Sequence, residues 1–250
     1  MTTIVTFDID WAPDWAIGLC HELCRSAGVP ATFYATHQCD ALDALLADPM
    51  IEVGVHPNFL AGSSHGEDTL SVLDHCRKLV PDAASMRTHG LHQSTLMFSA
   101  VMDHCPSIIA DASLFLPGHP YLQPTLLHLG RSRPLVRLPY WWEDDIAACT
   151  PGCVWAPPAP RDGELRIYDF HPIHVALNMC SLDSYRSLKQ HLDKPLWLAS
   201  RGDVAPFANP DGPGTRYFLQ ELLDNADSGS FSRVVDVAKD HLAAVGAGCA

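Results

Sequence analysis

Near its amino terminus the chain carries Ile4-Val5-Thr6-Phe7-Asp8-Ile9-Asp10, an apolar, largely β-branched run that ends in two carboxylates. A run of this kind is typical of a buried strand. Alternate residues of a strand point to the same side, so Asp8 and Asp10 share a face, and the apolar residues beside them turn to the other. Two carboxylates this close together are stabilised by a nearby cation. The stretch therefore predicts a buried strand with two acidic groups at its carboxyl end.

Further along the chain, similar apolar runs alternate with amphipathic segments. Strands are predicted at 31–35, 51–55, 85–88, 107–110, 135–138 and 165–170, and helices at 13–27, 41–47, 68–79, 94–104, 182–192, 214–225 and 231–243. Alternation of strand and helix produces parallel strands with crossover helices. The sequence therefore predicts an α/β fold, either a barrel or a doubly wound sheet.

The composition excludes several classes of protein. The 250 residues include 16 Lys and Arg against 29 Asp and Glu, which gives a formal net charge of −13. An acidic chain is a poor match for nucleic acid, so no nucleic-acid partner is expected. Hydrophobic residues make up 47% of the chain, which argues against intrinsic disorder. We see neither a secretory signal nor an apolar run of membrane-spanning length, so we expect a cytoplasmic protein without membrane insertion.

Nine cysteines are too few for a disulfide scaffold at this length, and reduced thiols are expected. Two pairs, Cys20 with Cys24 and Cys149 with Cys153, have C-x3-C spacing, which leaves a structural zinc or a disulfide open at either.

Histidines are unusually frequent, 14 in number, and two of them flank a loop at the end of a predicted strand. His56 follows the strand at 51–55, and His65 ends a loop that contains Pro57 and Gly62. In α/β folds ligands bind at the carboxyl ends of the strands, where Asp8 and Asp10 are also predicted. Two imidazoles and one of these carboxylates would hold a divalent metal ion and leave positions open for water and substrate. That donor set fits Zn²⁺ best, and also Fe²⁺, Co²⁺ or Ni²⁺.

Three more motifs follow predicted strands. Arg87, in Arg87-Thr88-His89-Gly90, could hold a buried Asp ionised, or form a surface ion pair. His171 follows the strand at 165–170 and suits general acid catalysis near pH 7, or a structural role. Tyr140-Trp141-Trp142-Glu143-Asp144-Asp145 is typical of the wall of a sugar site, although packing of the core is an equal alternative.

Taken in order, these motifs resemble the polysaccharide deacetylase family, also called the NodB-homology domain or carbohydrate esterase family 4, and its WbmS-like branch most of all. The resemblance covers roughly residues 1–180. It rests on Thr6-Phe7-Asp8-Ile9-Asp10, Ala31-Thr32-Phe33-Tyr34, His56-Pro57-Asn58-Phe59 with Ser64-His65-Gly66, Arg87-Thr88-His89-Gly90, Arg137-Leu138-Pro139-Tyr140 with Trp142-Glu143-Asp144, and Phe170-His171-Pro172.

The resemblance implies a distorted (β/α) barrel with extra C-terminal helices. We expect one catalytic domain over 1–250, with the barrel over about 1–180 and a helical part over about 181–250. The family pattern implies Asp8 as catalytic base, Arg87 as the group that orients it, and His171 as catalytic acid. It implies Asp10 and His56 as metal ligands; the family's second His falls at Leu60, so His65 is expected to replace it. Substrate contacts are expected from Asn58, His89, Tyr140, Trp142 and Asp144.

The function that this resemblance implies is metal-dependent removal of an N-acetyl group from an amino sugar of a bacterial surface polysaccharide or its precursor. The partner is then an N-acetylated sugar, and the oligomeric state stays open. Three alternatives remain: an amidohydrolase for a small N-acylated or cyclic amide, a silent sugar-binding homologue, and a metallophosphoesterase. The last is disfavoured because Arg87 is the one phosphate clamp that the motifs offer.

Overall fold

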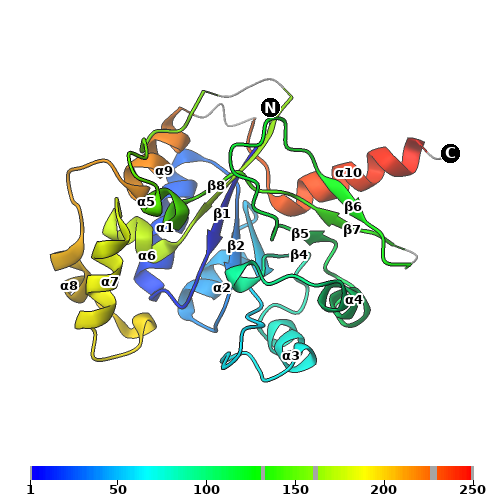
Figure 1. Cartoon of the computed structure of the whole chain (residues 1–250), viewed down its shortest axis with the longest axis horizontal. Coiled ribbons are helices and arrows are strands. Elements are labelled where there is room, and N and C mark those ends of the chain that lie inside the picture. The colour runs from blue at the N-terminus through cyan, green and yellow to red at the C-terminus, as the bar shows by residue number, and fades with distance from the viewer. Residues whose placement is uncertain (1, 131–132, 160–162, 226–229, 249–250) are drawn as a thin grey trace.

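The computed structural model describes residues 2–130, 133–159, 163–225 and 230–248, and its centre is a curled sheet of nine strands (Figure 1). The strands are β1 (Thr2–Asp8), β2 (Ala31–Ala35), β3 (Ile51–Val55), β4 (Ser85–Met86), β5 (Ala110–Asp111), β6 (Thr125–Leu127), β7 (Leu135–Arg137), β8 (Trp142–Glu143) and β9 (Leu165–Phe170). Their order is β6-β7-β5-β4-β3-β2-β1-β9-β8. Neighbours run parallel except β6 and β7. The predicted α/β barrel is confirmed in distorted form, as a half-barrel whose order starts at β6 and ends at β8.

Helices connect the strands and cover the outside of the sheet, except for the C-terminal helix, which packs against the inner face (Figure 1). They are α1 (Asp14–Ala27), α2 (Asp40–Ala47), α3 (Thr69–Leu79), α4 (Thr95–His104), α5 (Asp144–Cys149), α6 (Pro172–Leu177), α7 (Leu182–His191), α8 (Arg201–Val204), α9 (Thr215–Asp224) and α10 (Val234–Gly248). Helices α7, α9 and α10 match the three predicted near the carboxyl terminus. None of the described helices is long and apolar enough to cross a membrane.

The sequence patterns did not predict five of these elements: β6, β8, α5, α6 and α8. Strands of two or three residues and helices of four to six are too short to show a hydrophobic period. Pairing with a neighbour defines β8 instead, since Trp142 and Glu143 align with Tyr168 and Asp169 of β9. The region between β7 and β9, where no element was predicted, therefore contains a strand and a helix that both lie near the carboxyl end of β9.

Alternation along β1 separates an outer core from an inner one. Phe7 belongs to the outer core beneath the helices, where its ring stacks on Phe33 with centroids 4.4 Å apart. Ile4 belongs to the inner core, with Ile167 of β9 and Val234 of α10. The strand period of two therefore also directs Thr6 and Asp8 inward. The predicted carboxylate at the end of β1 lies inside the barrel.

The first turn of α10 closes the barrel at the amino-terminal end of the strands. The backbone N–H of Val234 donates to Oγ1 of Thr32 at 3.1 Å, and that of Val235 donates to Oε2 of the buried Glu52 at 2.9 Å. The beginning of the helix thus has its free N–H groups satisfied by the inner face of the sheet. The C-terminal helices expected from the sequence include one that is part of the barrel core.

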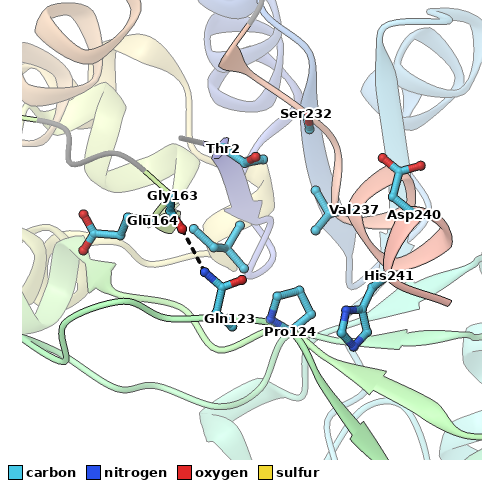
Figure 2. A pocket seen from close by; sticks show the side chains of 10 residues that line it. Thr2, Gln123, Pro124, Gly163, Glu164, Ser232, Val237, Asp240 and His241 are labelled. Atoms are coloured by element: carbon cyan, nitrogen blue, oxygen red, sulfur yellow. Dashed lines mark hydrogen bonds between the residues drawn. The ribbon is translucent and has the colours of Figure 1, made fainter. Parts of the chain in front are cut away.

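A cavity of about 290 Å³ lies at this same amino-terminal end, lined by the first residues of β1 and β9 and by α10 (Figure 2). Its lining includes Gln123, whose amide donates to the carbonyl oxygen of Gly163 at 2.9 Å. None of the residues predicted from the motifs lines it. The predicted site belongs to the opposite end of the sheet.

Candidate metal centre and active site

The predicted side chains converge at the carboxyl ends of neighbouring strands. Asp8 ends β1, His56 follows β3, Arg87 follows β4, and His171 follows β9. Asp10 lies two residues beyond β1 in a turn where its φ is 44° and that of Trp11 is 54°. Left-handed conformations at two consecutive non-glycine residues are uncommon and cluster at functional sites. The turn is fixed by the N–H of Trp11, which donates to Oγ1 of Thr36 at 3.1 Å.

Asp10, His56 and His89 form a compact group of three possible metal ligands. Nε2 of His56 lies 3.2 Å from Oδ1 of Asp10, and Nδ1 of His89 lies 3.0 Å from the same oxygen. The two nitrogens are 3.3 Å apart. Burial opposes ionisation of Asp10, but its hydrogen bonds with the two imidazoles hold its pKa well below the ordinary value. The group therefore presents one carboxylate and two ring nitrogens at a single point.

The spacing of these atoms fits a metal ion. Ligands about 2.1 Å from Zn²⁺, at angles between octahedral and tetrahedral, lie about 3.0–3.4 Å from one another. The three separations, 3.0, 3.2 and 3.3 Å, all fall in that interval. The other ring nitrogen of His56, Nδ1, is buried without a hydrogen-bond partner and lies 3.6 Å from Oδ1 of Asp8. A hydrogen bond from the remote nitrogen to a carboxylate is the usual support of a metal-bound imidazole, and here the carboxylate of Asp8 lies just beyond that distance.

His65 lies outside this group. Its Nδ1 accepts the backbone N–H of Asn58 at 3.2 Å, and its ring stacks on His75 with centroids 4.3 Å apart. Burial lowers the pKa of His65 to about 4, so the ring is neutral and its proton is on Nε2. Neither nitrogen then offers a free lone pair. Leu60, at the family's usual second His position, is 45% exposed.

Arg87 links the predicted base to a second buried carboxylate. Its Nη1 donates to Oδ1 of Asp8 at 3.0 Å and also to Oδ1 of Asp169, and all three side chains are almost wholly buried. The guanidinium lies between two rings, with Cζ 4.9 Å from the centroid of Tyr34 and 4.5 Å from that of Tyr140. Two carboxylates and two aromatic rings thus hold the guanidinium of Arg87 in place. A group of Asp8, Asp169 and His171 also has ligand-like composition, but this guanidinium already supplies its cation.

His171 is held by Asp144, the first residue of α5. Nδ1 of His171 lies 2.7 Å from Oδ1 of Asp144, and Oδ2 accepts the backbone N–H of His171 at 2.9 Å. Burial disfavours the imidazolium, but the neighbouring carboxylates of Asp144 and Asp10 hold the pKa of His171 well above its ordinary value. Its Nε2 faces Asp10, 3.6 Å from Oδ2. A protonated imidazole therefore lies beside the candidate metal ligands.

Most of the residues expected to contact substrate are engaged in other contacts. Tyr140 is wholly buried, and its hydroxyl donates to Oε2 of Glu143 at 2.8 Å. The ring of Trp142 stacks on Phe218 of α9, with centroids 4.2 Å apart. Asp144 is buried beneath His171, and Asn58 is 9% exposed. The structure thus places these four side chains in supporting positions, and it places His89 among the possible metal ligands.

Of two further carboxylates of the site, Asp169 received no role from the sequence, and Glu143 was expected only as part of the wall of a sugar site. Asp169 aligns with Thr6 on the neighbouring strand and accepts its hydroxyl at 2.7 Å. Glu143 has its pKa raised to about 8 by burial and by the nearby Asp145. The alternation Leu165, Ile167, Asp169, His171 was a usable signal, because the strand period of two puts Asp169 on the face of His171.

Comparison with known proteins identifies the family. The model of the WbmS-like polysaccharide deacetylases matches residues 5–189. A crystal structure from Bordetella bronchiseptica, described as a candidate polysaccharide deacetylase involved in O-antigen biosynthesis, is 32% identical in sequence, covers 89% of each chain and superposes with a TM-score of 0.77. No curated protein matches the chain significantly. The fold, the strand-end site and the family match agree, and the chain belongs to the WbmS-like polysaccharide deacetylases.

Proposed function

We propose that this chain is a metal-dependent N-deacetylase for an amino sugar of a bacterial surface polysaccharide or its precursor. Asp10, His56 and His89 hold the ion in this proposal, with Zn²⁺ first and Fe²⁺, Co²⁺ or Ni²⁺ also compatible. The observation that carries it is the triangle of three ligand atoms, 3.0 to 3.3 Å apart, beside Asp8 and His171. The surface-polysaccharide substrate is taken from the description of the Bordetella structure.

A divalent ion held by Asp10, His56 and His89 would supply a Lewis acid for the amide oxygen and would lower the pKa of the attacking water. Asp8 accepts the proton of that water. Nη1 of Arg87, 3.0 Å from Oδ1 of Asp8, fixes the carboxylate so that it faces the group of metal ligands. His171 donates a proton from Nε2 to the departing amine, since its Nδ1 is bound to Asp144. Asp8 as base and His171 as acid thus act on the two ends of the breaking C–N bond.

The test is acetate release from a panel of N-acetylated sugars and nucleotide sugars. The protein is stripped of metal with a chelator and reloaded separately with Zn²⁺, Co²⁺, Ni²⁺ or, without oxygen, Fe²⁺. Acetate is expected from at least one sugar with the reloaded protein, and none from the stripped protein. Acetate release that survives complete stripping contradicts the metal mechanism. Protein that binds one ion but releases acetate from no sugar would favour an amidohydrolase for small amides or a silent homologue.

A further inference from the structure

The site contains a second group of one Asp and two His, whose spacing differs from that of the first. Oδ1 of Asp144 lies 2.7 Å from Nδ1 of His171 and 3.0 Å from Nδ1 of His174. A separation of 2.7 Å is short for two ligands of one ion and ordinary for a hydrogen bond to a carboxylate. This second group is therefore a hydrogen-bonded cluster, and its third member, His174, takes no part in the reaction described above.

We propose that His174 is a positioning residue, which holds Oδ1 of Asp144 where that oxygen fixes the ring of His171. The proposal rests on the acid role of His171 in the proposed function. His174 lies in the first turn of α6, which begins directly after His171, and it is 4% exposed. It is therefore placed to act through Asp144, without contact with the reacting atoms.

The protonation of the cluster follows from the chemistry of the carboxylate. Burial raises the pKa of Asp144, but the two neighbouring imidazoles outweigh burial and hold that pKa below its ordinary value. An ionised carboxylate only accepts hydrogen bonds, so both imidazoles donate to it through Nδ1. This assignment leaves Nε2 of His171 to face Asp10. The cluster thus selects the ring nitrogen of His171 that reaches the substrate amine.

The two oxygens of Asp144 accept three hydrogen bonds, and His174 supplies the one that does not come from His171. The other two, from Nδ1 and from the backbone N–H of His171, both come from the residue to be fixed. Without His174, the carboxylate would be free to turn together with the ring that it orients. His174 is itself supported by Tyr185 of α7, since the two rings meet edge to face with centroids 4.8 Å apart. Helix α7 therefore contacts the residue that, in this proposal, holds Asp144 and through it His171.

Two substitutions of similar polarity separate the hydrogen bond from general packing. In His174→Asn the amide nitrogen takes about the place of Nδ1, whereas in His174→Gln it takes about the place of Nε2 and faces away from Asp144. With zinc-loaded protein and the sugar that the wild type deacetylates best, kcat of the Gln variant is expected to fall about tenfold, because a misplaced general acid loses part of its contribution. The Asn variant is expected to keep kcat within about threefold, and KM and zinc content to stay unchanged in both.

Equal kcat in the Asn and Gln variants, whether high or low, overturns the proposal. If the Gln variant does not fold, His174→Ala assayed with and without added imidazole replaces it, and failure of imidazole to raise kcat counts against the proposal. A second measurement needs no substrate. The Nδ1–H proton of His171 should give a downfield proton NMR signal that persists in the Asn variant and is lost by exchange in the Gln variant. The same signal in both variants overturns the positioning role, even if the wild type releases no acetate and the proposed function fails.

Discussion

Nε2 of His56 and Nδ1 of His89 lie 3.3 Å apart, although 33 positions separate the two residues in the chain. They are brought together because β3 and β4 are neighbours in the sheet and both residues follow the carboxyl ends of these strands. Each nitrogen also lies within 3.2 Å of the same oxygen of Asp10. The third ligand of the proposed metal centre therefore comes from the segment that follows the neighbouring strand β4, and not from the loop that begins at His56.

The first prediction distinguishes His89 from His65 as a metal ligand. His89→Ala should weaken Zn²⁺ binding by at least about 100-fold, because it removes one of three direct ligands. His65→Ala should bind Zn²⁺ like the wild type, because Nδ1 of His65 is occupied by the N–H of Asn58. Competition with a chromogenic chelator measures both affinities, and circular dichroism checks the fold. The opposite ranking of the two variants would return His65 to the metal centre.

The second prediction concerns Asp8 as general base. Asp8→Asn should lower kcat by about 10²–10⁴-fold, the usual contribution of a positioned base, and retain zinc. The paired variant Asp10→Asn should lose zinc, since Oδ1 of Asp10 is the oxygen shared by both imidazoles. Acetate release and elemental analysis measure the two effects. An Asp8→Asn protein that retains more than a tenth of the wild-type kcat would exclude this role.

The third prediction follows from the raised pKa of Glu143, about 8 against an ordinary value of 4.5. Between pH 4.5 and about pH 8 the carboxyl group of Glu143 is deprotonated in the unfolded chain and still protonated in the folded chain. The free energy of unfolding therefore falls as pH rises through this interval. Above pH 8 the contribution no longer changes. Glu143→Gln lacks this group and keeps an acceptor for the hydroxyl of Tyr140.

The Gln variant should therefore gain stability relative to the wild type as pH rises from 6 to 9. We expect a gain of about 2 kcal/mol, after a discount for the partial exposure of Glu143. Urea unfolding of both zinc-loaded proteins at several pH values measures the difference. A difference that is the same at pH 6 and pH 9 would show that Glu143 titrates normally.

The fourth prediction tests the inner core at Gly54. A Cβ there would lie 2.7 Å from the carbonyl oxygen of Ser85 and 2.8 Å from Cδ1 of Tyr34, the ring that packs against Arg87. Gly54→Ala should therefore destabilise the protein by about 1–3 kcal/mol through overpacking. Gly18→Ala is the control, because nothing lies within 4 Å of a Cβ at this position of α1.

Chemical denaturation compares the two glycine variants. The control should gain about 0.5–1 kcal/mol from the better helix propensity of alanine. A Gly54→Ala protein as stable as the wild type would contradict this prediction, because it would show that Tyr34 can move to make room for a Cβ at position 54.

The long strands and their chemistry were predictable from local pattern. The runs that form β1, β2, β3 and β9 are five to seven residues long, enough to show strand composition, and the titratable residues at their ends were recognised as a site. Strands β4, β5 and β8 have two residues each and depend on their neighbours for their hydrogen bonds. The position of Asp144 beneath His171 depends on β8 and α5, and neither element was predicted from local pattern. For this reason the sequence analysis expected Asp144 to contact the substrate and not to support His171.

What the sequence pattern by itself determined is the α/β class and the set of strand ends that carry chemistry, while the barrel was implied by the family resemblance. Alternation and composition are local properties, so they can be seen without the fold. The tertiary structure alone decided which side chains meet: His89 with His56 and Asp10, Asp169 with Arg87, and His174 with Asp144. These pairings depend on strand order and on the hydrogen bonds that occupy each ring nitrogen. Both are set by contacts between residues far apart in the chain, so the spacing of residues within a motif does not predict them.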